Sequence, residues 1–220
     1  MSNQLSRERI GVLGGSFDPL HWGHLKPTEE VAQELGFTKI KLMPAFVSPL
    51  KSHTNATPAQ RVEMIDNFCQ THPLFETDKR EIIAEQTSYT VESLSSLKRE
   101  MPECQLNFFM GMDSLLSFHK WYRWQDIVEM SNLIVTERPG YQISQLPEQL
   151  ESTISSMLVD KTSWDFEQSG NQVFLCTNKM LNISSTEIRQ RISQNLPCAD
   201  LLPASVIRYI KQHSLYQHEN

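Results

Sequence analysis

The chain has 220 residues, of which 39% are hydrophobic and 21% charged, as is ordinary for a soluble globular protein. Its formal net charge of −6 argues against a general nucleic-acid-binding surface, so that any attraction for anions must be local to a cleft. We expect one α/β domain over residues 1–220, with a C-terminal helical part from about residue 182.

The chain carries no recognisable targeting or membrane signal. Residues 1–8 are polar, and no apolar run approaches the roughly 18 residues that a membrane-spanning helix needs. The four cysteines are scattered without a Cys-x-x-Cys pair, which indicates reduced thiols. These features predict a cytoplasmic protein without membrane contact.

The first distinctive segment joins a predicted strand at residues 9–13 to a predicted helix at residues 25–35. Residues 14–24 read Gly-Gly-Ser-Phe-Asp-Pro-Leu-His-Trp-Gly-His. Glycines at 14 and 15 let the main chain approach a ligand, and histidines can donate charge-assisted hydrogen bonds to phosphate. The segment predicts an anion site where backbone amides and a helix N-terminus converge.

Other interpretations fit this segment less well. They are a metal site, a plain turn and the two common phosphate-binding loops. Neither the P-loop pattern nor the dinucleotide fingerprint Gly-x-Gly-x-x-Gly is present. His21 and His24 could ligate a metal, but no Glu follows the first, and Pro19 and Gly23 argue against one continuous helix face. A glycine-rich stretch before a helix can also be only a tight turn.

Strands and helices keep alternating along the chain. The predicted strands are 39–43, ended by Pro44, 105–110 and 132–136; the predicted helices are 58–69, capped by Thr57, and 89–101. Residues 141–171 give only a modest helix pattern, from 146 to 158. The order predicts a doubly wound, Rossmann-like parallel sheet with helices on both faces and ligands beyond its carboxyl-terminal edge.

Two further clusters fall where such a sheet would bind a ligand. Gly111 and Asp113 follow the 105–110 strand, where a carboxylate can accept from ribose hydroxyls, although a cap for a helix beginning at Ser114 would look similar. In residues 182–189, Ser184 or Ser185 would cap a helix whose free amides, with Arg189, could bind a polyphosphate. An ordinary capped surface helix would look much the same.

Several motifs together resemble a known family. Residues 16–24 resemble the His-x-Gly-His signature of nucleotidyltransferases, and Ile-Ser-Ser-Thr-x-Ile-Arg at 183–189 resembles their second signature. The runs that resemble the nicotinate-nucleotide adenylyltransferase family specifically are Gly-x-Asp-Ser-Leu at 111–115, Trp-Tyr at 121–122, Arg-Pro-Gly at 138–140 and Ser-Tyr-Thr at 88–90. The similarity extends from Gly11 to the 201–210 run.

The resemblance implies transfer of an adenylyl group from ATP to nicotinate mononucleotide, with Mg²⁺ bound through the ATP phosphates. It implies catalytic roles for His21, His24 and Arg189. The implied ATP-binding residues are Gly14, Gly15, Ser16, Phe17, Gly111, Asp113, Arg138, Ser184, Ser185 and Thr186. The implied residues for nicotinate mononucleotide are Lys51, Thr90, Trp121 and Tyr122.

The chain departs from the family at one position. The family commonly has Pro-Pro-His before a basic residue, where this chain has Ser-Pro-Leu-Lys, so that Leu50 replaces the histidine. Lys51 remains to meet the mononucleotide phosphate, or is a solvated loop lysine, and His53 could compensate for the missing imidazole.

Alternatives remain for the acceptor end and for the function. Trp121 stands at helix-like spacing between Phe118 and Trp124 and could be a core residue. The first motif also serves nicotinamide-mononucleotide, phosphopantetheine and cytidylyl transferases, and a nucleotide-binding regulator without turnover is a further alternative. We expect ATP and nicotinate mononucleotide as partners, no nucleic acid, and leave a homo-oligomer open.

Overall fold

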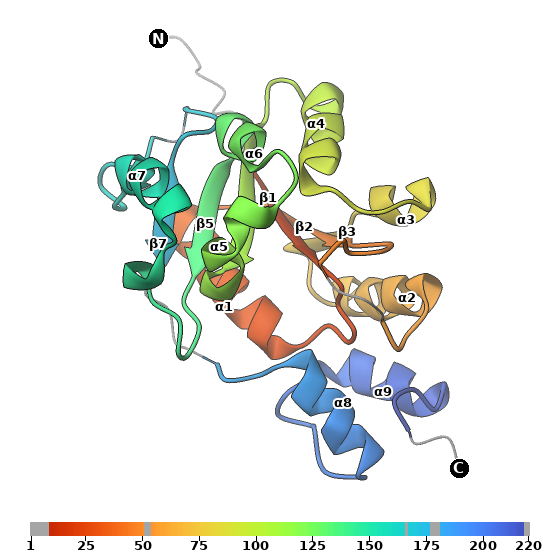
Figure 1. Cartoon of the computed structure of the whole chain (residues 1–220). Helices are drawn as coiled ribbons and strands as arrows, with labels where there is room; N and C mark the ends of the chain where they lie inside the picture. The colour runs from red at the N-terminus through yellow and green to blue at the C-terminus, as the bar shows by residue number, and fades with distance from the viewer. Residues whose placement is uncertain (1–8, 51–53, 166, 177–180, 218–220) are drawn as a thin grey trace.

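The computed structural model describes residues 9–50, 54–165, 167–176 and 181–217 (Figure 1). Its sheet has seven parallel strands in the order β3-β2-β1-β4-β5-β7-β6. The strands are β1 (Arg9–Gly15), β2 (Lys39–Pro44), β3 (Phe75–Thr77), β4 (Gln105–Gly111), β5 (Asn132–Thr136), β6 (Leu158–Val159) and β7 (Val173–Cys176). The predicted doubly wound parallel sheet is confirmed.

Helices connect and flank these strands. The α-helices are α1 (Trp22–Leu35), α2 (Pro58–Cys69), α3 (Arg80–Ala84), α4 (Thr90–Glu100), α5 (Met112–Leu116), α6 (Trp124–Met130), α7 (Glu148–Met157), α8 (Ser185–Ser193) and α9 (Ala204–Gln212). Two short 3-10 turns are η1 (Phe118–Lys120) and η2 (Ile143–Gln145).

Alternation along the strands divides the core between the two faces of the sheet. Phe108 of β4 packs in one cluster with apolar side chains of α4, α5, α6 and α7, whereas its neighbour Phe109 packs in a second cluster with α1 and α2. Successive side chains of a strand point to opposite faces, so each buried strand supplies both clusters. The prediction of helices on both faces of the sheet is therefore confirmed.

The C-terminal helices have a separate apolar cluster. Buried side chains of α8 and α9, including Ile188 and Tyr209, pack with Met64 of α2. In Figure 1, α8 and α9 lie together beside α2 and beneath α1. The segment after residue 182 therefore contains α8 and α9, and it packs on the rest of the chain through α2.

Several predicted boundaries need correction. Helix α1 begins at Trp22 with His21 as its N-cap, so Gly23 and His24 lie inside the first turn, where Gly23 was expected to interrupt the helix. Helix α5 begins at Met112 rather than at Ser114. The short elements β3, α3 and β7 were not predicted, because three to five residues are too few to show a periodic pattern.

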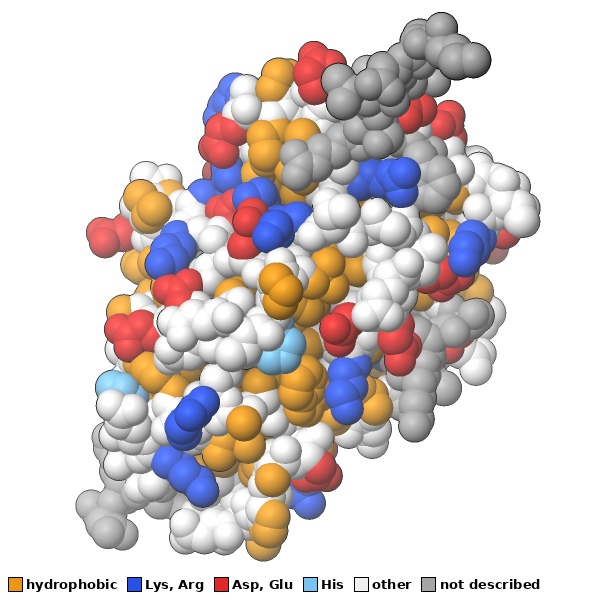
Figure 2. Space-filling model, turned by 180° about the vertical axis from the view of Figure 1, so that it is seen from behind, with side chains coloured by type: hydrophobic (Ala, Val, Ile, Leu, Met, Phe, Trp, Pro, Cys, Tyr) orange, Lys and Arg blue, Asp and Glu red, His pale blue; other side chains and the backbone are white. Residues whose placement is uncertain are grey.

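The surface carries charges of both signs. In Figure 2, the view from behind, lysine and arginine side chains are interspersed with aspartate and glutamate, and apolar side chains lie between them. Within the ranges described above, no helix is both long and apolar enough to cross a membrane.

Candidate active site

A pocket of about 630 Å³ gathers segments from both halves of the chain at the carboxyl ends of the central strands. The predicted site residues that line it are Gly14, Gly15, Ser16, Phe17, His24, Thr90, Gly111, Asp113, Trp121, Tyr122, Arg138, Ser185, Thr186 and Arg189. His21 and Ser184 are not among the described residues that line it. Lys51 and His53 lie outside the described residues.

The two histidines of the first motif differ in exposure. His21 is only 1% exposed, and its ring stacks on that of His24 with centroids 3.6 Å apart. The ring of Phe17 is nearly perpendicular to that of His24, with centroids 5.3 Å apart. His24 is thereby packed between two rings and faces the pocket, while His21 supports it from behind.

A buried arginine holds the loop before these histidines. Arg61 of α2 is 0% exposed; its Nη1 donates to the main-chain oxygen of Ser16 at 2.8 Å, and its Nη2 to that of Phe46 at 3.2 Å. Burial lowers the pKa of Arg61, and the charge of Asp18 opposes this effect. In the sequence, the burial of Arg61 could have been recognised from its place on the apolar face of the 58–69 helix, in register with Ile65 and Phe68.

The carboxylate of Asp18 is a second anchor that sequence reasoning missed. It accepts hydrogen bonds from the main-chain amides of Asn55 at 2.7 Å and Ala56 at 3.0 Å. The hydroxyl of Tyr216 donates to it at 2.8 Å. Asp18 therefore fixes the 16–21 loop to the start of α2 and to the C-terminal segment.

The second motif docks directly on the first. Ser185 Oγ donates to the carbonyl of Pro19 at 3.3 Å, across 166 residues of sequence. Arg189 Nη1 donates to the carbonyl of Asp18 at 2.7 Å. Gly23 permits this approach, because a Cβ there would lie 3.0 Å from the carbonyl oxygen of Ile183.

Ser184 has a structural role at this junction. Its hydroxyl accepts from the amide of Glu187 at 3.1 Å and caps α8, as expected for one of the two serines. Helix α8 thereby presents Ser185, Thr186 and Arg189 to the pocket while Ser184 orders its first turn.

Gly111, Asp113 and Arg138 form another wall of the pocket. Arg138 Nε lies 3.3 Å from Asp113 Oδ1. A Cβ at position 111 would come within 2.5 Å of that carboxylate oxygen and 3.0 Å of the guanidinium. The glycine therefore leaves room for this ion pair at the end of β4.

The aromatic residues of the predicted acceptor site occupy different environments. The half-buried ring of Trp121 packs on two core rings, so it also belongs to the core. Its centroid lies 5.3 Å from that of Phe118 and 6.0 Å from that of Phe108. Its Nε1 is buried without a hydrogen-bond partner among the described residues. Tyr122 is 53% exposed, and its ring centroid lies 5.0 Å from that of Tyr89. Tyr89 also lines the pocket. The Ser-Tyr-Thr run at residues 88–90 could have indicated it.

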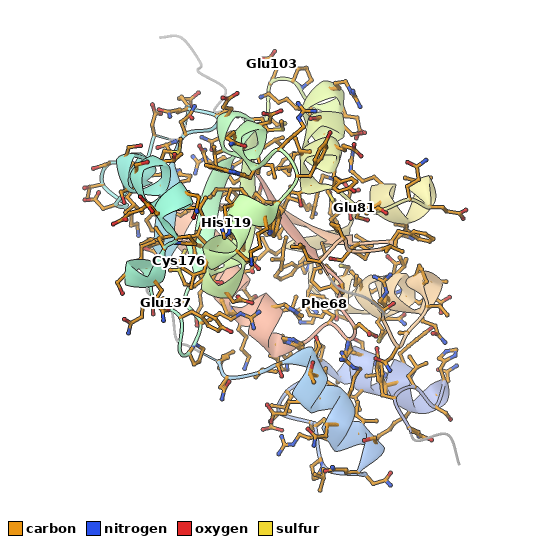
Figure 3. The ribbon with its side chains drawn as sticks, in the orientation of Figure 1. Phe68, Glu81, Glu103, His119, Glu137 and Cys176 are labelled. Carbon is orange, nitrogen blue, oxygen red and sulfur yellow. The ribbon has the colours of Figure 1, made fainter. Side chains whose placement is uncertain are left out.

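Polar side chains of α3 and α4 complete this end of the pocket. Glu81, labelled in Figure 3, accepts from Ser93 Oγ at 2.5 Å. Burial raises the pKa of Glu81, and its hydrogen bond from Ser93 opposes that shift. Glu81 is among the residues that line the pocket.

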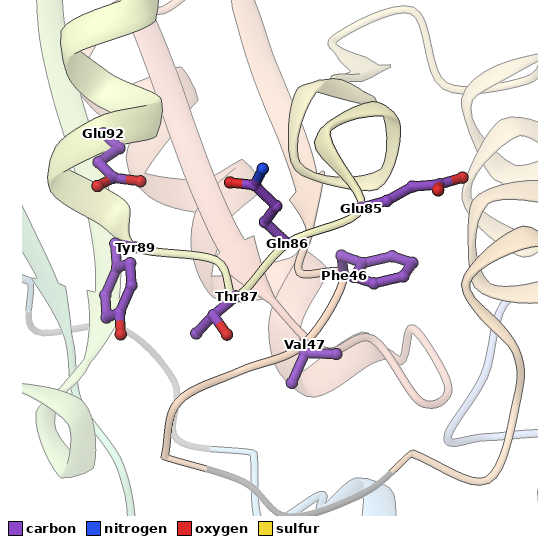
Figure 4. Close-up of a pocket in the computed structure, with 7 residues that line it drawn as sticks. All are labelled: Phe46, Val47, Glu85, Gln86, Thr87, Tyr89 and Glu92. Carbon is purple, nitrogen blue, oxygen red and sulfur yellow. The ribbon is translucent and has the colours of Figure 1, made fainter.

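A neighbouring cavity of about 570 Å³ opens beside the acceptor end (Figure 4). It lies between the segment of Phe46 and Val47 and residues 85–89, and shares Tyr89 with the main pocket. The amide of Ser88 donates to the carbonyl of Val47 at 2.8 Å, and the amide of Phe46 donates to Ser88 Oγ at 2.9 Å. These bonds fix the start of the loop that carries Leu50, which lines the main pocket and is 52% exposed.

The lining carboxylates are already engaged by protein groups. Asp18 accepts from two amides and a hydroxyl, Asp113 faces Arg138, and Glu81 accepts from Ser93. In the part of the chain that the structure describes, no group of three His, Cys, Asp or Glu residues could hold a metal ion. This donor set fits a divalent cation that arrives on ligand phosphates and keeps its water ligands.

The chain is similar to known proteins along nearly its whole length. The profile of the Cytidylyltransferase-like family matches residues 12–191. A protein of Pectobacterium atrosepticum named probable nicotinate-nucleotide adenylyltransferase is 39% identical over 205 residues, which cover 93% of this chain and 96% of the relative. A protein of the same name from Serratia proteamaculans is 39% identical over 207 residues, 94% of each chain.

Solved structures show the same fold. Nicotinic acid mononucleotide adenylyltransferase of Plasmodium falciparum in complex with NaAD superimposes with a TM-score of 0.71 at 18% identity, covering 96% of this chain and 98% of that one. The same enzyme in complex with APC gives a TM-score of 0.70. With these relatives matched along nearly its whole length, the chain belongs to the nicotinate-nucleotide adenylyltransferase family of nucleotidyltransferase enzymes.

Proposed function

We propose that the enzyme transfers the adenylyl group of ATP to nicotinate mononucleotide, which releases pyrophosphate and forms nicotinate adenine dinucleotide. The mononucleotide phosphate attacks the α-phosphorus, and the bond to the bridging oxygen of pyrophosphate breaks. This reaction asks the protein mainly to position two anions and to neutralise charge in the transition state. No covalent enzyme intermediate is needed.

His24 and Arg189 provide the charge for this step. The imidazole of His24 faces the pocket beside Gly15 and Ser16, so it can donate to phosphate oxygens as the α-phosphorus is attacked. Arg189, with Ser185 and Thr186 in the first turns of α8, would hold the β- and γ-phosphates. His21 remains a predicted catalytic residue; its burial behind His24 favours a supporting contact.

The other walls suit the nucleoside and the acceptor. Asp113 and Arg138, beside Gly111, would face the ATP ribose and base. Trp121 and Tyr122 offer aromatic faces to an electron-poor pyridinium ring, and Thr90 at the start of α4 offers its amide to the carboxylate. Lys51 is proposed to meet the mononucleotide phosphate.

We also propose that the divalent cation is Mg²⁺, held by the ATP phosphates. Bound there, it would neutralise charge on the phosphate oxygens. We further propose a single nucleotidyltransferase domain over the whole chain. The cytoplasmic location and the absence of nucleic-acid partners stay predictions, and a homo-oligomer stays open.

The observation that carries the proposal is the shared pocket: His24 and Arg189 meet in one cavity with Trp121 and Tyr122. The test is a pyrophosphate-release assay with ATP and either nicotinate or nicotinamide mononucleotide. We expect turnover with the nicotinate form and much less with the amide. ATP binding without pyrophosphate release would instead identify a nucleotide-binding regulator.

A further inference from the structure

The C-terminal segment reaches back to the active site through one side chain. After α9, Ser214 and Tyr216 adopt left-handed backbone conformations with φ values of 49° and 62°, which residues other than glycine rarely do. Between them, Leu215 is 9% exposed and packs in the C-terminal cluster. Such backbone angles persist where the surrounding structure fixes them, and here they direct Tyr216 toward Asp18.

The hydroxyl of Tyr216 completes the hydrogen bonding of one oxygen of a buried carboxylate. It donates to Asp18 Oδ1 at 2.8 Å, across 198 residues of sequence. Burial, and then the negative charge of Asp18, raise the pKa of Tyr216, which keeps its proton available for donation. The amide of Ala56 also donates to Oδ1, and that of Asn55 donates to Oδ2. Tyr216 and Ala56 therefore fill the two acceptor positions of Oδ1, while one position of Oδ2 stays open among the described residues.

This arrangement determines how Asp18 meets Arg189. Arg189 Nη1 lies 2.7 Å from the main-chain oxygen of Asp18 but 3.9 Å from its carboxylate oxygen Oδ2. The guanidinium therefore bonds to a neutral carbonyl, although a carboxylate that is 5% exposed lies beside it. Charge-assisted bonds to Arg are the stronger ones, so a carboxylate that was free to turn toward this cation would form a closer ion pair with it.

We propose that Tyr216 is a positioning residue of the ATP site. By holding Oδ1, its hydroxyl keeps the carboxylate from turning toward the Arg189 guanidinium and drawing it into a closer ion pair, away from the ATP phosphates. The same bond ties the end of the chain to the 16–21 loop that carries the histidines. The inference rests on the proposed function, since it assigns Arg189 to the phosphates.

The test compares Tyr216→Phe with the matched control Tyr209→Phe. Tyr209 also donates to a carboxylate, that of Glu63 at 2.7 Å, but neither residue lines the pocket. Loss of a hydrogen bond to a charged group predicts a rise in the KM for ATP of about ten-fold in Tyr216→Phe. The KM for nicotinate mononucleotide and all constants of Tyr209→Phe should stay near the wild-type values.

Calorimetric titration of each variant with ATP measures the same change without turnover. An ATP affinity of Tyr216→Phe within two-fold of wild type would overturn the inference, as would equal losses in both variants. In an Asp18→Asn background, the loss of ATP affinity caused by Tyr216→Phe should be smaller. An undiminished loss in that background would also overturn the inference. Wild-type protein that binds ATP but releases no pyrophosphate would refute the proposed function and leave this binding test decisive.

Discussion

Individual side chains in the pocket have unequal tasks. The two histidines of the first motif are stacked 3.6 Å apart, yet only His24 is among the described lining residues. Arg189 is held by the main-chain oxygen of Asp18 and faces the same cavity. We therefore predict that His24 and Arg189 contact a bound triphosphate, with orientations that other residues fix.

Replacing His24 by Ala should lower kcat by on the order of 10²-fold or more, since a preorganised donor to the transition state is lost. Steady-state pyrophosphate release measures the effect, and circular dichroism checks that the fold is kept. His72→Ala is the control, because His72 stacks on Phe68 outside the lining residues. Near-normal turnover of the His24 variant would remove this imidazole from the mechanism.

Trp121→Ala should raise the KM for nicotinate mononucleotide and leave the KM for ATP nearly unchanged, because the ring face offered to the pyridine is removed. Trp124→Ala is matched to it: both indoles pack on Phe118, but only Trp121 lines the pocket. Equal effects of the two changes on the mononucleotide KM would mean that Trp121 acts only as a core residue.

At the scale of elements, helix α2 supports the loops on either side of the pocket. Its N-terminus has a capping box formed by Thr57 and Gln60, and the amides of Asn55 and Ala56, just before the helix, donate to Asp18. One turn further, Arg61 bonds to the loop after β1 and to the loop after β2. The site therefore depends on a helix that contributes no lining side chain among its described residues.

Arg61→Met should lower the free energy of unfolding by about 1–3 kcal/mol, because the carbonyls of Ser16 and Phe46 lose buried donors. Since both loops are loosened, the KM values for ATP and for the mononucleotide should rise together. Chemical denaturation and kinetics measure the two effects. Arg99→Met on the exposed side of α4 is the control, and an unchanged stability of the Arg61 variant would contradict the anchoring role.

The whole molecule buries several groups that must stay protonated when folded. Burial raises the pKa of Cys69 from 9.0 to about 11. It also raises the pKa of Cys176, the last residue of β7, which is labelled in Figure 3. Below pH 9 these thiols are protonated in both the native and the unfolded chain. Above it, the unfolded chain releases protons that the native state retains, which favours unfolding.

The Tm should therefore fall as the pH rises from 9 toward 11, the interval between the usual and the raised pKa of Cys69. Thermal denaturation across this range measures the slope. Cys69→Ala should show a shallower decline than the wild type. An identical slope in that variant would exclude Cys69 as a contributor.

Local signals made part of the molecule predictable. The strands at residues 105–111 and 132–136 and the helix at residues 58–69 were predictable because buried periodicity, caps and prolines act within a few residues. The anchors Asp18, Arg61 and Tyr216 were not singled out, since their partners are distant in sequence. In a sequence, a charged residue that will be exposed cannot be told from one that will be buried until its bonding partner is known.

The sequence by itself determined the parallel α/β architecture and predicted the two phosphate motifs, because strand–helix alternation, glycine placement and helix caps are short-range features. Only the tertiary structure decided which groups meet. It stacked His21 behind His24, placed Arg189 on the carbonyl of Asp18 and brought the hydroxyl of Tyr216 to its carboxylate. These contacts join segments up to 198 residues apart, and their geometry depends on how three apolar clusters pack together.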